Sequence, residues 1–232
     1  LKNKDGLLLQ NDCDKAEALN ANFSDIFILV INNMTVIDDR VGVDDLLSDA
    51  SFNVDQVHKQ LRKLKAKSSS GPDGIPTVFL KNLADSLALP LSIVFNVSYN
   101  ESKLPDVWKL ADITPIFKKG SSSDVNNYRP ISLTCVCSKI MESIIKDHVI
   151  SFLLQHKLIT KQQHGFLSKH STCSNLLECI NDWTLASDAI NSTDVAYIDF
   201  SKAFDSVVHT KLLLKLKSYG VSGRIFDWIA DF

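Results

Sequence analysis

Residues 197–205 read Tyr-Ile-Asp-Phe-Ser-Lys-Ala-Phe-Asp, and this stretch leads an apolar run into a carboxylate and then into a small polar turn. The β-prone residues 195–198 predict a short strand that ends at Asp199. A carboxylate at the end of a strand faces out of the sheet, and proteins bind Mg2+ through one or two such groups together with water and phosphate oxygens. Asp199 is therefore a candidate metal ligand.

The residues after Asp199 extend this prediction to an anion. If Ser201, Lys202 and Ala203 begin a helix, their free backbone N–H groups can receive a phosphate, as helix N-termini commonly do. A metal ion and a phosphate would then lie side by side. Taken alone, the segment leaves an alternative open, in which Asp199 caps a helix and Asp205 is a solvated carboxylate.

The composition predicts a globular protein with one basic region. The 232 residues are 45% hydrophobic and 22% charged, and the net charge is −2. Residues 1–56 hold 4 Lys and Arg against 11 Asp and Glu, whereas residues 57–120 hold 10 against 5. The basic middle is the predicted nucleic-acid face, and the acidic start is unsuited to phosphates.

The cysteines and the N-terminus bear on the compartment. Five cysteines without a Cys-x-x-Cys pair favour neither a disulfide framework nor a zinc site, so a reducing compartment is expected. The apolar stretch 23–31 is interrupted by Ser24 and Asp25 and is far shorter than the roughly 20 residues of a membrane helix. The chain begins at Leu1 without a leader, so we expect an internal fragment and not a secreted precursor.

The first third of the chain predicts a connector followed by a new unit. A helix is expected around residues 14–27, then an Asp-rich connector up to Asp49, and then a helix over residues 54–64 capped by Asn53 or Asp55. Five cations cluster on its polar side: Lys59, Arg62, Lys63, Lys65 and Lys67. The Gly- and Pro-rich run 68–76 ends this helix, and we interpret it as a flexible hinge in preference to an ordered loop.

Helices over residues 77–87 and 91–101 are expected next, followed by strands over residues 108–117 and 126–133 that form a hairpin. Lys118 and Lys119 at its tip and Arg129 on the returning strand would bring three cations together. Arg holds phosphate oxygens bidentately and Lys acts as a point charge. The alternative is a solvated basic turn.

Four more helices complete the pattern: residues 138–154, residues 171–185, one after Asp199 that Gly220 ends, and residues 224–232. His164 and His170 lie between the first two of these helices. Neither has a partner at ligand spacing, so both are interpreted as structural or backbone-contacting residues.

Six motifs follow one another in this chain. They are Gly-Pro-Asp-Gly-Ile-Pro at 71–76, the segment from Trp108 to Pro-Ile-Phe-Lys-Lys-Gly at 115–120, Asn-Tyr-Arg-Pro-Ile-Ser-Leu at 127–133, Gln-His-Gly-Phe at 163–166, His-Ser-Thr at 170–172, and residues 197–205. In this order and spacing the set resembles the reverse transcriptase of non-LTR (LINE-type) retrotransposons, in particular that of jockey-like and CR1-like animal elements. The resemblance covers roughly residues 1–232.

The resemblance implies an α+β right-hand polymerase fold, mostly helical with short antiparallel strands, of which this chain holds the fingers and part of the palm before the palm hairpin. Residues 1–51 would be the acidic connector that follows an endonuclease domain. Residues 52–190 would be the fingers and the start of the palm. Residues 191–232 would be the first catalytic strand of the palm and the helices after it.

The resemblance also implies a role for each candidate residue. Asp199 would be the first of three carboxylates that bind two Mg2+ ions, with the backbone carbonyl of Phe200 as a further ligand. The N–H groups of residues 201–203 would hold the triphosphate, and Phe204 would be the aromatic gate that excludes a 2′-hydroxyl. The cations that neutralise the triphosphate would be Lys118, Lys119 and Arg129.

The implied reaction is RNA-directed DNA synthesis by two-metal phosphoryl transfer in target-primed retrotransposition, in the nucleus or cytoplasm and away from membranes. Its partners would be template RNA, primer or target DNA and deoxynucleoside triphosphates. Leu167 departs from the family, where an Arg commonly follows Gly-Phe. The second and third carboxylates are missing from residues 1–232, so this chain is expected to be inactive as given. The alternative is a decayed or non-catalytic remnant that retains nucleic-acid binding.

Overall fold

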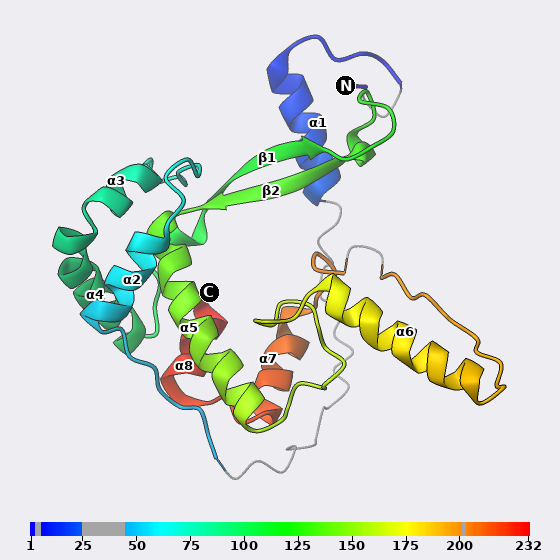
Figure 1. The fold of residues 1–232 in the computed structure, drawn as a ribbon. Coiled ribbons are helices and arrows are strands. Elements are labelled where there is room, and N and C mark those ends of the chain that lie inside the picture. The colour runs from blue at the N-terminus through cyan, green and yellow to red at the C-terminus, as the bar shows by residue number, and fades with distance from the viewer. Residues whose placement is uncertain (3–5, 25–44, 201–202) are drawn as a thin grey trace.

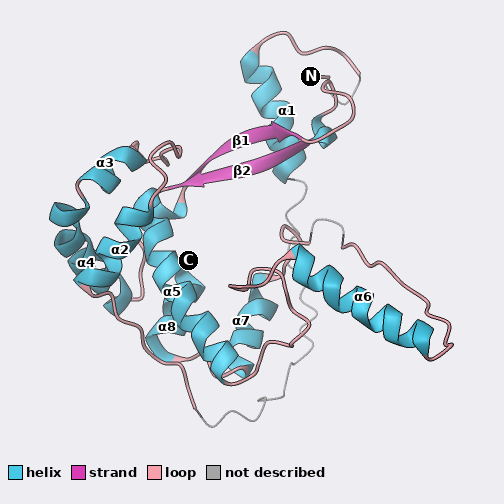
Figure 2. Ribbon diagram, in the orientation of Figure 1, coloured by secondary structure: helices cyan, strands magenta, loops and turns pink. Residues whose placement is uncertain are grey.

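The computed structural model describes residues 1–2, 6–24, 45–200 and 203–232 (Figure 1). The described part is an α+β structure of helices and one two-stranded antiparallel sheet (Figure 2). Its elements are α1 (Asp12–Ser24), α2 (Val54–Lys63), α3 (Thr77–Asn82), α4 (Ala84–Asn100), the 3-10 helix η1 (Asp106–Lys109), β1 (Ala111–Phe117), the 3-10 helix η2 (Val125–Asn127), β2 (Tyr128–Thr134), α5 (Val136–Gln155), α6 (Thr172–Asp188), α7 (His209–Ser218) and α8 (Gly223–Asp231).

The hydrophobic core lies among α2, α3, α4, α5 and α8. Its fully buried side chains include Phe52, Phe95 and Trp228. Edge-to-face contacts join Phe52 to Tyr99 with ring centroids 5.4 Å apart and Phe95 to Trp108 with centroids 5.8 Å apart. The helix predicted over residues 138–154 is confirmed as α5, in which Ile140, Ile144, Ile145, Phe152 and Leu153 are buried and Val149 is partly buried.

Local sequence signals explain where α2 begins. Asn53 caps the helix: its Oδ1 accepts a hydrogen bond from the Gln56 amide at 2.8 Å, and the Gln56 side chain accepts one from the Asn53 amide at 3.3 Å. This reciprocal capping box satisfies two backbone donors that would otherwise lack partners. Of the two caps proposed from the sequence, the structure selects Asn53.

Residues 68–76 form an ordered loop, so their interpretation as a hinge is wrong. The Gly74 amide donates to the Gly71 carbonyl at 2.9 Å, the Ile75 amide to the Asp73 carboxylate at 3.1 Å, and the Thr77 hydroxyl to the Ser68 carbonyl at 3.2 Å. Gly71 is buried against the backbone at residues 134–135, and Gly74 has a φ of +64°. The glycines serve close packing and a left-handed turn, which sequence alone cannot distinguish from flexibility.

The boundary between the next two helices differs from the prediction. The first helix ends at Asn82, and α4 runs from Ala84 to Asn100 with Pro90 inside it. Pro90 removes one backbone donor, but α4 packs against α2 and buries residues along its whole length, among them Ala84, Ala88 and Phe95. Tertiary packing therefore carries the helix through the proline.

The predicted hairpin is confirmed. Strands β1 and β2 pair in antiparallel register, with Ala111 opposite Thr134 and Phe117 opposite Tyr128. Most of its side chains are exposed, and it projects from the helical core (Figure 1). Helix α1 lies alongside it and buries Leu19 and Phe23. The helix predicted over residues 14–27 is thus confirmed up to Ser24, and residues 25–27 lie outside the described part.

Residues 45–50, predicted as the end of a connector, pack against the C-terminal helices. Leu47 exchanges backbone hydrogen bonds of 3.0 and 2.8 Å with Gly220 and Ser222. Asp49 pairs with Arg224 at 2.9 Å. Gly220 and Gly223, both with positive φ, lie so close to the carbonyls of Asp45 and Ser48 that a Cβ would fall 3.0 and 2.8 Å from them. Chain segments far apart in sequence are thereby joined around α8.

Residues 191–200 have no regular secondary structure, so the strand predicted over residues 195–198 is wrong. A strand needs a hydrogen-bonded neighbour, and no described segment pairs with these residues. Tyr197 and Ile198 are consequently exposed, at 86% and 79%. Helix α6 before them buries none of its residues and exposes Leu176, Leu177 and Ile180.

One ion pair ties α8 to the start of the hairpin and gives a pH-dependent prediction. The Lys109 ammonium, at 2.7 Å, and the Leu104 amide, at 2.8 Å, hold the pKa of Asp231 below its ordinary value. A lowered carboxyl pKa adds stability at neutral pH, and this stability is lost as the pH falls through that pKa. We expect Asp231→Asn to lower the free energy of unfolding at neutral pH and to have less effect in acid, as measured by urea titration. An effect that grows in acid would contradict this.

Candidate metal and nucleotide site

Asp199 lies in the extended segment between α6 and the turn before α7. Its side chain is exposed, and no hydrogen bond or ion pair joins its carboxylate to any described residue. No described group therefore competes with a ligand for the carboxylate oxygens. The next residue, Phe200, is 75% exposed.

The fit of this segment to a metal ion rests on a single carboxylate. Among residues 1–2, 6–24, 45–200 and 203–232, no group of three His, Cys, Asp or Glu side chains is placed to hold a metal ion. Oxygen donors are what a phosphate-handling divalent cation prefers, so Asp199 and the Phe200 carbonyl fit as two of its ligands. Of the predicted triphosphate-binding residues, Ser201 and Lys202 lie outside the described part, and Ala203 begins an exposed turn.

Phe204, the candidate gate, contacts another motif. Its ring meets that of Phe166 edge to face, with centroids 5.8 Å apart and planes at 86°. Phe166 has a φ of +64°, an uncommon conformation for an aromatic residue, and is otherwise 90% exposed. The structure thus brings the segment at 163–166 next to the segment at 203–205, a contact that could not be predicted from the sequence because no local pattern encodes it.

The three candidate cations lie on the hairpin, and all are exposed. Arg129 stands opposite Ile116 in the register, and the Lys118 amide continues the ladder by donating to the Asn127 carbonyl at 2.8 Å. Side chains alternate along a strand, so Arg129 and Lys118 occupy one face of the hairpin. None of the three forms an ion pair with a described residue.

Asp205 lies near the hairpin face that does not carry Arg129 and Lys118. Ile113, Pro115, Pro130 and Ser132 line a cavity of about 600 Å³ together with α1 and Asp205. By the same alternation, this face is opposite to that of Arg129 and Lys118. The structure therefore places Arg129 and Lys118 on the face of the hairpin away from Asp205.

His164 and His170 make structural contacts, as interpreted from the sequence. His164 is buried, with Nδ1 2.9 Å from the Ser174 hydroxyl and Nε2 3.1 Å from the Glu178 carboxylate. Ser174 and Glu178 lie one helical turn apart on α6. His170 Nδ1 lies 3.1 Å from the Ser168 carbonyl. His164 therefore anchors the loop at 163–170 to α6.

Comparison with known proteins decides the family. The profile described as "Reverse transcriptase (RNA-dependent DNA polymerase)" matches residues 116–232, which include the hairpin tip, residues 163–172 and residues 197–205. The chain belongs to the reverse transcriptase family. Its relatives place it among the reverse transcriptases of non-LTR retrotransposons, so the resemblance seen in the sequence is confirmed.

Three relatives illustrate the extent of the match. The RNA-directed DNA polymerase from mobile element jockey of Drosophila melanogaster is 31% identical over 72% of this chain and 18% of its own length. The protein of the same name from Drosophila funebris is 31% identical over 77% of this chain and 20% of its own. The retrovirus-related Pol polyprotein from type-1 retrotransposable element R1 of Bradysia coprophila is 26% identical over 84% and 20%.

This reverse transcriptase segment spans about a fifth of the length of the curated relatives it matches. None of its described helices has the length and apolar character needed to cross a membrane. Reverse transcriptases use divalent metal ions, for which Asp199 is the candidate ligand in this segment.

Proposed function

We propose that this chain is the fingers and the first part of the palm of an RNA-directed DNA polymerase that extends a primer 3′-hydroxyl with deoxynucleotides during target-primed retrotransposition. The family match over residues 116–232 carries this proposal, because it contains the segment with the exposed carboxylate of Asp199. Residues 1–51 are proposed as the connector, residues 52–190 as the fingers and start of the palm, and residues 191–232 as the first palm segment.

In this proposal Asp199 and the Phe200 carbonyl hold Mg2+. When bound, a pair of such ions activates the attacking hydroxyl and neutralises the leaving pyrophosphate. The residues of this chain position the nucleotide: the N–H groups at 201–203 bind its phosphates and the Phe204 ring packs under its sugar. The exposure of both Asp199 and Phe204 supports these roles, since a nucleotide can reach them.

Lys118, Lys119 and Arg129 are proposed to neutralise the triphosphate. Because Arg129 and Lys118 occupy the hairpin face opposite to that near Asp205, their contact with a nucleotide at Asp199 requires the hairpin and the segment at 199–205 to move relative to one another. The proposed partners are template RNA, primer or target DNA and deoxynucleoside triphosphates. The free cysteines of the described part fit a reducing, intracellular compartment.

Primer extension tests the proposed function. A polymerase that carries this segment is incubated with an RNA template, a DNA primer, deoxynucleotides and Mg2+, and the product is resolved by length. We expect DNA synthesis that depends on the RNA template and stops when the metal is chelated. A polymerase with an intact Asp199 that makes no DNA would contradict the proposal.

Phe204→Ala tests the gate. Removing the ring removes the steric conflict with a 2′-hydroxyl, so ribonucleotide incorporation relative to deoxynucleotides should rise by about tenfold or more, a change of at least roughly 1.4 kcal/mol in discrimination. Single-nucleotide incorporation kinetics measure the ratio. Tyr197→Ala, which removes another exposed aromatic ring from the same segment, serves as the control. Unchanged discrimination in Phe204→Ala would refute the gate.

A further inference from the structure

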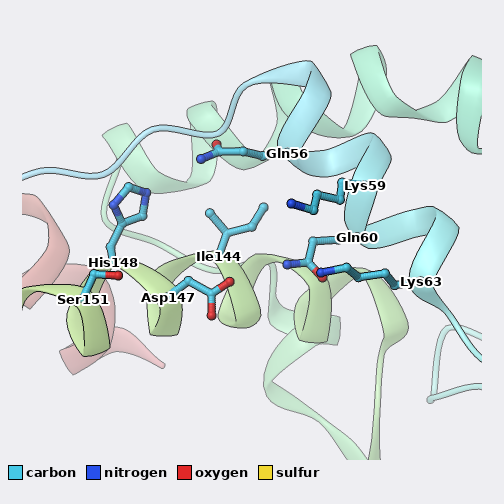
Figure 3. A pocket seen from close by; sticks show the side chains of 8 residues that line it. All are labelled: Gln56, Lys59, Gln60, Lys63, Ile144, Asp147, His148 and Ser151. Carbon is cyan, nitrogen blue, oxygen red and sulfur yellow. The ribbon is translucent and has the colours of Figure 1, made fainter. Parts of the chain in front are cut away.

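A polar groove lies between α2 and α5, apart from Asp199, Phe204 and the hairpin cations (Figure 3). Its cavity volume is about 290 Å³. Helix α2 contributes Gln56, Lys59, Gln60 and Lys63, and α5 contributes Ile144, Asp147, His148 and Ser151. We call this set the α2–α5 groove. Figure 1 shows α2 and the segment that follows α6 on opposite sides of α5, so the groove is separate from the Asp199 segment.

The α2 wall supplies cations and amide donors. Lys59 and Lys63 are four residues apart, hence on one face of the helix, and both are exposed and free of ion pairs with the described residues. Figure 3 shows them reaching from α2 toward α5. Gln56 uses its carbonyl oxygen in the capping box, which leaves its NH2 group free to donate.

The α5 wall holds a buried ring nitrogen without a partner. His148 Nε2 is inaccessible to solvent and has no hydrogen-bond partner among the described residues. Buried polar atoms in proteins are nearly always hydrogen-bonded, so such an atom calls for an explanation. Figure 3 shows the His148 ring rising from α5 toward the chain that leads into α2, at one end of the groove. Because solvent does not reach Nε2 in this conformation, a ligand in the groove would supply the missing partner once the ring turns toward it.

The charge of the groove selects an anion. Two lysines face one carboxylate, Asp147, and that carboxylate is already paired with Lys146 at 3.2 Å. Lys binds phosphate as a point charge, and amides, hydroxyls and imidazole add hydrogen bonds to phosphate oxygens. The wall contains no aromatic ring other than that of His148 on which a base would stack. The groove is therefore suited to a sugar–phosphate backbone and not to base recognition.

We propose that the α2–α5 groove binds a phosphate of a single-stranded RNA backbone, held by Lys59 and Lys63 and completed by His148. The inference rests on the proposed RNA substrate, but it does not depend on catalysis at Asp199. It extends the RNA contact surface to a face of the protein that the polymerase motifs do not include.

RNA binding by the 232-residue chain tests the groove. A fluorescent single-stranded RNA is titrated with wild-type protein and with Lys59→Gln/Lys63→Gln at several salt concentrations, and anisotropy is measured. We expect the double variant to bind about tenfold more weakly. We also expect the slope of log binding constant against log salt concentration to be shallower by about 0.7 for each phosphate that the variant no longer neutralises.

The control variant Lys211→Gln/Lys217→Gln removes the same charge from two exposed lysines of α7. It should retain nearly the wild-type affinity and slope. An equal loss in both double variants would overturn the proposal, because binding would then reflect net charge and not the groove.

Asp147→Asn tests the sign of the ligand charge. Removing the one carboxylate of the groove should strengthen RNA binding, whereas weaker or unchanged binding would overturn an anion site.

His148→Leu should weaken binding while the melting temperature stays at or above that of the wild type. A melting temperature that falls together with affinity would show that His148 acts only in folding.

Competition with inorganic triphosphate tests whether the groove binds a phosphate of an RNA strand or a free polyphosphate. A strand site requires that the RNA be displaced only at triphosphate concentrations well above the RNA Kd. Displacement at or below that Kd would identify a free polyphosphate site and overturn the strand assignment. If groove variants bind RNA like the wild type while the polymerase still extends primers, the groove assignment fails and the proposed function stands.

Discussion

Asp199→Asn is expected to reduce DNA synthesis by about a thousandfold or more in a polymerase that carries this segment, because a lost carboxylate ligand removes several kcal/mol of transition-state stabilisation by the metal. Asn preserves the size of the side chain and changes its charge. Since Asp199 is exposed and unpaired among the described residues, the melting temperature should not change. Loss of DNA synthesis at an unchanged melting temperature would therefore report on metal binding and not on folding.

The measurement is single-turnover primer extension at saturating nucleotide, with thermal unfolding followed in parallel. Asp194→Asn is the matched control, because Asp194 is an exposed carboxylate in the same extended segment. It should retain full activity. Synthesis by Asp199→Asn within about tenfold of wild type would exclude Asp199 as a metal ligand.

Gly71→Ala is expected to give the largest loss of stability from a single methyl group. A Cβ at Gly71 would lie 2.5 Å from the Cys135 nitrogen and 2.5 Å from the Thr134 carbonyl carbon, where backbone atoms and not a flexible side chain must yield. Overpacking commonly costs about 1–3 kcal/mol, and a clash with backbone belongs at or above the upper end of that range. A domain of this size loses roughly 2–4 °C of melting temperature per kcal/mol.

Gly74→Ala in the same loop is the control for backbone strain. Gly74 has a φ of +64° but open space around its Cβ position, so its substitution carries only the left-handed conformational cost of about 1–2 kcal/mol. Urea titration of both variants should show the larger loss for Gly71→Ala. Equal losses would mean that residues 71–76 do not pack against residues 134–135 in solution.

Most of the secondary structure could be predicted from the sequence because its signals are local. The hairpin, the Asn53 cap and the apolar face of α5 follow from side-chain alternation, capping chemistry and helical spacing, which act within a few residues. The predictions that failed depend on distant partners. The glycines at 71 and 74 indicated flexibility until residues 134–135 were placed beside Gly71.

For the candidate site too, the sequence predicted the residues but not how they are arranged in space. Motif order along the chain identified the family and selected Asp199, Phe204 and the hairpin cations, and comparison with relatives confirms the family. Sequence could not show that Arg129 occupies the hairpin face opposite to that near Asp205, or that Phe166 contacts Phe204. These relations depend on strand register and on how separate segments pack.

The sequence by itself determined the family, the helices, the hairpin and the residue types of the candidate site, since periodicity, capping and motif chemistry are written in neighbouring residues. Only the tertiary structure decided that residues 68–76 are an ordered loop and that residues 45–50 join α8. It alone also decided that residues 195–198 have no strand partner among the described residues and that α2 and α5 form a polar groove. The physical reason is that burial, pairing and groove formation each require a second chain segment, and its position is set by the packing of the whole core.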